Sequence, residues 1–139
     1  MATLYSVNKT IERGITPATI LAPGLSGGNV RCFVDTYVGL GTEAGADVIQ
    51  FGPALPVGAT ILWGSITCDT MGGTPDLGDG VDVDAYVDEA TDNAVTMFND
   101  VITGIGKTIA ATTGQVSLTL DAAVTAAGVI TVVVFYTVE

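Results

Sequence analysis

The chain has 139 residues, of which 48% are hydrophobic and 14% charged, with 15 acidic residues, 4 basic residues and no histidine. This length suits one domain, and high hydrophobicity with few charges excludes a disordered chain. A net charge of −11 excludes the basic patch that nucleic acid binding requires, and it disfavours anionic membranes for the same reason. A chain this apolar must bury its apolar surface either in a compact fold or in contacts between subunits, and we expect an oligomer.

In residues 1–29 the apolar residues follow neither the periodicity of a helix nor that of a strand, and Pro and Gly interrupt the segment. These residues are therefore predicted to form an extended N-terminal arm. An apolar arm exposed to solvent would associate non-specifically, and we therefore expect it to pack over a partner's surface. No charged-then-apolar leader is seen, and the apolar run 129–138 is shorter than the roughly 20 residues of a membrane span. The expected partner-binding anchors are Leu4, Tyr5, Ile11, Ile15, Ile20 and Leu21.

Residues 30–139 are predicted to form one β-sandwich domain. Runs rich in β-branched and aromatic residues alternate with Gly-rich turns, and long amphipathic helices are missing. Ile61, Trp63 and Ile66 are the candidate core of one long strand. Seven further aromatic residues are expected in the core as well: Phe33, Tyr37, Phe51, Tyr86, Phe98, Phe135 and Tyr136. The fold class is therefore all-β, an antiparallel β-sandwich or jelly roll. The expected strands are 30–38, 47–52, 60–69, 81–87, 94–102, 107–112, 115–122 and 128–139.

Catalytic motifs are absent from the sequence. Without histidine, the usual general base near neutral pH and any Ser–His or Cys–His pair are missing. GIGKT (104–108) has Val101 where a phosphate-binding loop needs glycine, and no helix start follows GLGTEA (39–44). Carboxylates could serve a glycosidase, but the chain has few aromatics to line a sugar cleft. We predict no catalytic residue, no cofactor and no enzymatic activity.

Cys32 and Cys68 each lie inside an apolar, strand-like run. No CxxC pair exists and histidine is missing, so a zinc site is not expected. Two interpretations stay open: buried free thiols, or a disulfide between neighbouring strands.

Residues 76–92, DLGDGVDVDAYVDEATD, concentrate six aspartates and one glutamate. One hypothesis is a calcium site, because calcium prefers several carboxylate oxygens on a Gly-containing loop. No EF-hand register fits, however, since the third position falls on Gly78 or Val81. The alternation in 81–87 instead predicts a half-buried strand with its acidic residues outward and Val81, Val83, Ala85 and Val87 inward. The residues that would ligate calcium under the first hypothesis are Asp76, Asp79, Asp82 and Asp84.

One longer pattern carries a family resemblance. LPVGATILWGSITCDTMGG (55–73), followed by LGDGVDVDAYVDEATD (77–92), resembles small virion structural proteins of tailed bacteriophages, of the head-decoration kind. The start MATLYSVNKT, the segment LAPGLSGGNVR and the terminal VVVFYTVE are similar to the same group. The resemblance covers most of the chain, but it transfers no functional residue position by position.

The resemblance implies a β-sandwich or jelly-roll domain that binds the outside of a capsid and reinforces it, often as a trimer. The implied partners are the major capsid protein and other copies of the chain, and the implied location is the virion surface after synthesis in the host cytoplasm. Two alternatives remain. The chain could have another virion role, such as a head fibre, a tail component or a capsid subunit, or it could be a calcium- or carbohydrate-binding module that uses the 76–92 segment.

Overall fold

The computed structural model describes residues 29–98 and 105–138, and every regular element in these ranges is a β-strand. The described residues contain no helix that is long and apolar enough to cross a membrane. The predicted all-β fold class is thus confirmed. Of the predicted arm, 1–29, only Asn29 belongs to the described residues, and it is the first residue of the first strand. The strands are β1 (Asn29–Gly39), β2 (Val48–Phe51), β3 (Thr60–Cys68), β4 (Asp76–Gly78), β5 (Ala94–Met97), β6 (Val116–Thr119) and β7 (Gly128–Val138).

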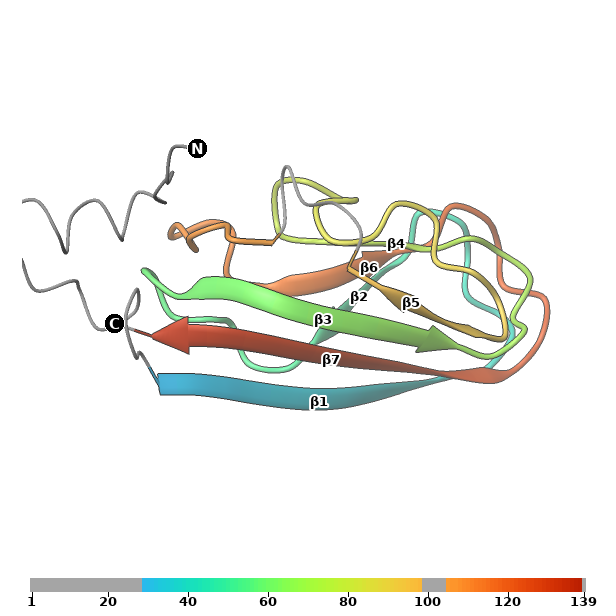
Figure 1. Ribbon diagram of the computed structural model, residues 1–139. Coiled ribbons are helices and arrows are strands. Elements are labelled where there is room, and N and C mark those ends of the chain that lie inside the picture. Colours follow the sequence, from blue (N-terminus) through green and yellow to red (C-terminus); the bar gives the residue numbers. More distant parts are fainter. Residues whose placement is uncertain (1–28, 99–104, 139) are drawn as a thin grey trace, which may run out of the picture.

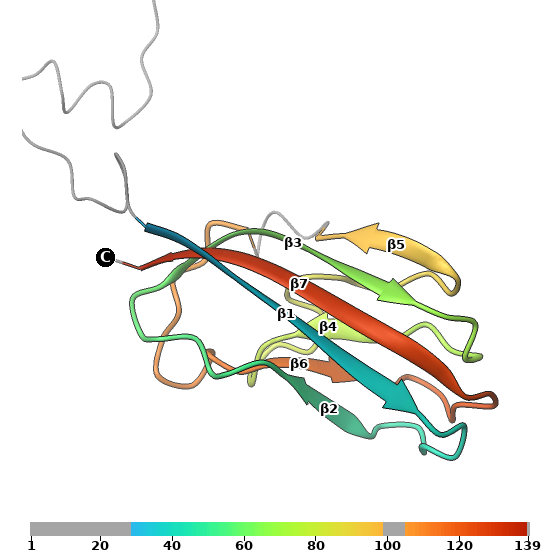
Figure 2. The same cartoon turned by 90° about the horizontal axis from the view of Figure 1, so that it is seen from below.

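The strands form two antiparallel sheets packed as a sandwich. The first sheet has the order β1-β7-β3-β5 and the second the order β2-β6-β4. Figure 1 shows β3, β7 and β1 side by side in one layer, with β2, β6 and β4 in the other. β1 and β7 pair along their whole length, with Asn29 opposite Val138 and Gly39 opposite Gly128. The start of β1 and the end of β7 therefore lie at the same end of the sandwich, as Figure 2 also shows.

The core lies between the two sheets. In β7 the buried residues Ile130, Val132 and Val134 alternate with more exposed neighbours, as the two-residue period of a strand requires, whereas Tyr136 and Thr137 near its end are both buried. Burying one large aliphatic or aromatic side chain stabilises a fold by roughly 1.5–3 kcal/mol. The largest fully buried side chains are Tyr86, Phe51, Ile61, Ile66, Leu77, Ile109, Leu118, Ile130, Val87, Val116, Val132 and Val134.

The strand predicted over 81–87 is wrong. Its residues form turns, and only Val87 makes a single bridge, to Leu77 in β4. Val81 and Val83, expected to face inward, are 68% and 50% exposed, whereas Ala85 and Val87 are buried as expected. The physical reason is Asp79, whose carboxylate accepts hydrogen bonds from nearby backbone amides and so stabilises a turn in place of an extended strand.

Three smaller differences concern neighbouring segments. The sequence predicts no strand between residues 69 and 81, but this stretch contains the short strand β4. In 107–112 there is no strand, only a bridge between Thr108 and Thr60. The prediction that Trp63 belongs to the core is wrong, because Trp63 is 39% exposed while Ile61 and Ile66 are fully buried. A β-bulge between Ile61 and Trp63 shifts the alternation at this point and turns Trp63 outward.

The turn after β1 is organised by Glu43. Its carboxylate accepts hydrogen bonds from the amides of Leu40 (2.7 Å), Gly41 (3.0 Å) and Thr42 (3.0 Å) and from the hydroxyl of Tyr37 (2.8 Å). These bonds, above all the one from the Leu40 amide, lower the pKa of Glu43 to about 2. The ionised Glu43 carboxylate therefore stabilises the turn between β1 and β2.

We expect the Glu43 carboxylate to make stability dependent on acid pH. A lowered pKa means that the stabilisation is fully present above the ordinary value near 4.5 and is lost as the pH falls towards about 2. Thermal unfolding between pH 6 and pH 2 should show the Glu43→Gln variant melting below the wild type at pH 6, with the difference narrowing in acid. Asp88→Asn, which removes an exposed carboxylate, is the control. A wild type and a Glu43→Gln variant with parallel pH profiles would contradict this role.

Candidate functional site

The outward-facing side of the first sheet carries no charged side chain. The pairing of β1, β7, β3 and β5 places one set of alternating residues on this side, which we call the outer face. It combines valines and threonines with two aromatic residues. Its members are Val30, Cys32, Val34, Thr36, Val38, Thr60, Trp63, Ser65, Thr67, Val95, Met97, Val129, Thr131, Val133, Phe135 and Thr137.

Many of these side chains are open to solvent. Val34 is 64% exposed at one edge of the sheet and Val95 is 61% exposed at the other. Between them, Trp63 packs against Phe135 with ring centroids 5.1 Å apart, and the hydroxyls of Thr36 and Thr131 lie 3.2 Å apart. An uncharged surface on which exposed apolar side chains gather in this way is a candidate for protein interaction. The outer face is therefore the main candidate functional site of the described residues.

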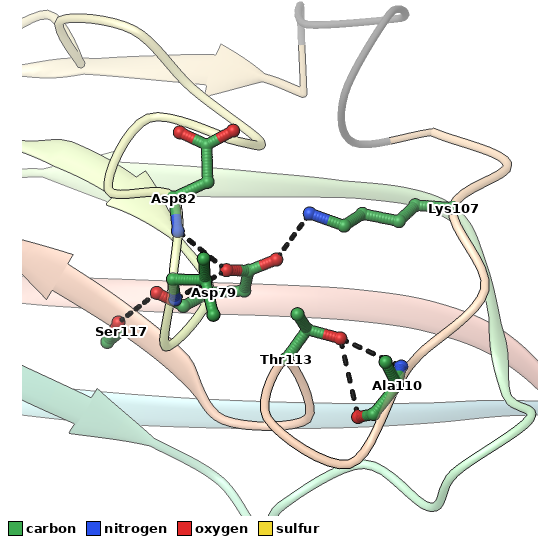
Figure 3. Close-up of polar contacts among 7 residues, drawn as sticks. Asp79, Asp82, Lys107, Ala110, Thr113 and Ser117 are labelled. Atoms are coloured by element: carbon green, nitrogen blue, oxygen red, sulfur yellow. Dashed lines mark hydrogen bonds and ion pairs between the residues drawn. The ribbon is translucent and has the colours of Figure 1, made fainter.

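Asp79 in the acidic segment is an internal structural anchor. Its side chain is fully buried, and Oδ1 accepts hydrogen bonds from the amides of Val81 and Asp82, both at 2.8 Å. Figure 3 shows Oδ2 bonded to the ammonium of Lys107, at 2.5 Å, and the backbone carbonyl of Asp79 bonded to the hydroxyl of Ser117. Burial alone would raise the pKa of Asp79, but the Lys107 ammonium and the two amides outweigh burial and lower the pKa. Asp79 is thus held as a carboxylate.

The structure does not gather the predicted calcium ligands. Asp76 accepts a hydrogen bond from the amide of Glu89 at 3.0 Å, and Figure 3 shows the Asp82 carboxylate pointing away from that of Asp79. The pKa of Asp82 is raised, mainly by a side-chain hydrogen bond with Asp84. In residues 29–98 and 105–138, no group of three or more carboxylates and thiols is arranged to hold a metal ion. Calcium binding stays a prediction.

A groove of about 240 Å³ lies on the second sheet beside the loop that follows Asp79. It is the natural place to look for the carbohydrate site of the alternative hypothesis. No aromatic ring lines it, so it lacks the flat apolar platform on which a sugar could stack. Its lining consists of Val48, Gln50, Asp79, Gly80, Val81, Val83, Gln115, Ser117 and Thr119. Carbohydrate binding also stays a prediction.

The two cysteines are free and differ in environment. Cys32 is exposed on the outer face, which contradicts the interpretation of two buried thiols and that of a disulfide. Cys68 is buried, and this burial is the main reason that its pKa is raised to about 12. Cys68 is therefore an inert core residue.

Sequence reasoning missed the outer face and the partner of Asp79. A usable signal for the outer face was the run GVITVVVFYTV, in which nearly every position is apolar, since a strand with one side in water should alternate. No signal pointed to Lys107, because it lies 28 residues from Asp79 in the chain. The six predicted arm anchors, from Leu4 to Leu21, lie outside the described residues.

These features define an all-β protein: an antiparallel two-sheet sandwich with an acidic surface and one uncharged sheet face. No protein-family model matches the chain, and no curated protein matches it. Two solved structures contain chains of similar fold. A chain of the "Cyanophage Pam1 capsid asymmetric unit" aligns with a TM-score of 0.70 and 24% identity, over 90% of this chain and 96% of that one. A chain of the "Capsid of Ralstonia phage GP4" aligns with a TM-score of 0.63 and 15% identity, over 94% and 96%.

Proposed function

We propose that the chain is a non-enzymatic virion structural protein, a decoration or cement subunit that binds the outer surface of a phage head and stabilises it as a trimer. The observation that carries the proposal is the fold match with chains of two phage capsid structures, which extends over at least 90% of this chain. The same two alignments each span 96% of the matched chain, so those chains are about as short as this one. A short chain suits an accessory subunit added to a shell.

The surface chemistry supports an accessory role on the outside of a particle. The net charge of −11 disfavours contact with packaged nucleic acid, because that contact needs lysine and arginine. The same charge keeps loaded particles apart in solution. The chain has no histidine, which supports a role without catalysis.

Within this proposal the arm, residues 1–29, attaches the subunit to the major capsid protein, while the sandwich supplies contacts between copies. The arm leads into β1 at the end of the sandwich where β7 also ends, so both termini of the domain lie on one side (Figure 2). Apolar burial of the six anchors Leu4, Tyr5, Ile11, Ile15, Ile20 and Leu21 would supply the binding energy, at roughly 25 cal/mol per Å².

Co-sedimentation with heads assembled without the chain tests the proposal. We expect the full chain to pellet with the heads and to raise the temperature at which they disassemble. A chain lacking residues 2–25 should stay in the supernatant with its fold intact, whereas Ser6→Ala/Ser26→Ala, which leaves the apolar anchors unchanged, should bind as the wild type does. Undiminished binding of the deleted chain would refute the role of the arm, and failure of the full chain to bind would refute the decoration role.

A further inference from the structure

We propose that the outer face of the first sheet is the surface through which this chain binds a second copy of itself. The inference deepens the proposed function by assigning a surface to the oligomer, and it rests on that function only for the expectation of self-association. A second copy is favoured over other occupants by the residue pattern of the strands, by the distribution of charge and by the size of the face.

The residue pattern is that of a sheet covered on both sides. β7 contributes Ile130, Val132 and Val134 to the core, yet Val129, Val133 and Phe135 on its opposite side are apolar as well. An antiparallel sheet with one side in water normally carries polar residues there, and runs that are apolar at nearly every position are typical of strands buried on both faces. In the described residues no other segment covers the outer side of β7 (Figures 1 and 2).

The charge distribution favours a copy of the same chain. Two copies that each carry a net charge of −11 repel one another, so they can approach closely only through surfaces free of carboxylates. The outer face meets that condition, because none of its residues is Asp, Glu, Lys or Arg. The 76–92 segment does not meet it, since Asp88, Glu89 and Asp92 are not buried. A partner of different composition could bind the acidic surfaces through basic groups, and it would have no need of a neutral face.

The size of the face suits a specific contact. Strands lie about 4.8 Å apart and rise about 3.3 Å per residue, so the four strands span about 15 Å across and the longest about 35 Å along. Two such faces together bury on the order of 1,000 Å², which reaches the lower bound for a specific interface. Flat sheet faces pack on each other about 10 Å apart through interdigitated side chains, and the paired rings of Trp63 and Phe135 provide aromatic anchors near the centre.

Equilibrium sedimentation of the full chain tests the assignment, with Val34→Asp and Val95→Asp as variants. Both valines are more than 60% exposed, so a carboxylate at either position leaves the core untouched. We expect the wild type to form an oligomer and each variant to dissociate with a Kd higher by on the order of 100-fold, because a buried unpaired carboxylate opposes association. A dimer or a trimer supports the proposal equally, since two faces can pack directly and three can surround a common axis.

Val81→Asp is the matched control. Val81 is 68% exposed, so the substitution adds the same charge at an equally open valine, but on the loop beside the second sheet. It should leave the Kd unchanged, and circular dichroism should show all three variants folded. A wild type that is monomeric at high micromolar concentration, or variants that associate as well as Val81→Asp, would overturn the assignment. Co-sedimentation with heads is scored separately, so a failed surface assignment and a failed decoration role give different results.

Discussion

Replacing Gly78 with alanine is expected to destabilise the domain by about 3 kcal/mol, the upper end of what overpacking costs. Gly78 is the last residue of β4 and is buried. A Cβ atom at this position would overlap the carbonyl oxygen of Asp82 and lie 2.5 Å from the carbonyl carbon and oxygen of Val83. All of these are backbone atoms, which cannot rotate away. The loop would have to shift as a unit, and its shift would break the hydrogen bonds that hold Asp79.

Urea unfolding followed by circular dichroism measures the effect, with Gly45→Ala as the control. The nearest atoms to a Cβ at Gly45 belong to Ala122, at 3.4 Å, which is ordinary van der Waals contact. Gly45→Ala should therefore lie within about 1 kcal/mol of the wild type, because alanine also restricts the unfolded chain. Equal stability of the two variants would show that the loop adapts to a side chain at Gly78.

Replacing Lys107 with methionine is expected to cost about 3 kcal/mol at pH 7, the low end of the range for removing one partner of a buried ion pair. Methionine keeps most of the apolar stem, but Oδ2 of the fully buried Asp79 side chain loses its ammonium partner. The amides of Val81 and Asp82 still bond Oδ1. The double variant Lys107→Met/Asp79→Asn should recover part of the loss, because it leaves no unpaired charge.

The pH dependence identifies the cause of this loss. In the wild type the pKa of Asp79 is lowered, so the pair stabilises fully above the ordinary value of about 3.9 and weakens as the pH falls below it. In Lys107→Met only the two amides still oppose the effect of burial, so the pKa of Asp79 rises. The difference between wild type and variant should therefore be largest near neutral pH and shrink in acid. Arg31→Met removes one exposed cation and controls for net charge. A loss that is independent of pH, or equal to that of Arg31→Met, would contradict the account.

The long strands could be predicted from sequence because local composition determines them. The segments 30–38 and 128–139 are rich in valine and aromatic residues, and they form β1 and β7 nearly as predicted. The strand expected over 81–87 has an equally clear alternation, yet it is absent. The buried carboxylate of Asp79 prevents the strand, because it accepts hydrogen bonds from the amides of Val81 and Asp82. In a strand these amides would have been available to a neighbouring strand.

The anchors of the fold could not be predicted, because they depend on contacts distant in sequence or on turn geometry. GIGKT and GLGTEA each resemble a phosphate-binding sequence without the context that such a site requires. In the structure, Lys107 from the first forms the ion pair with Asp79, and Glu43 from the second binds the turn amides. Both segments therefore have a structural role that no local pattern reveals. The outer face could not be predicted for the same reason. Its residues come from four strands, and these strands become neighbours only through the sheet order β1-β7-β3-β5.

The most direct test of the central claim is electron cryo-microscopy of heads assembled with and without the chain. The proposed decoration role predicts added density on the outer surface at three-fold positions, into which three copies of the sandwich fit, with each arm directed towards the shell. Density confined to the tail or to the inside of the shell, or no difference between the two particles, would contradict it.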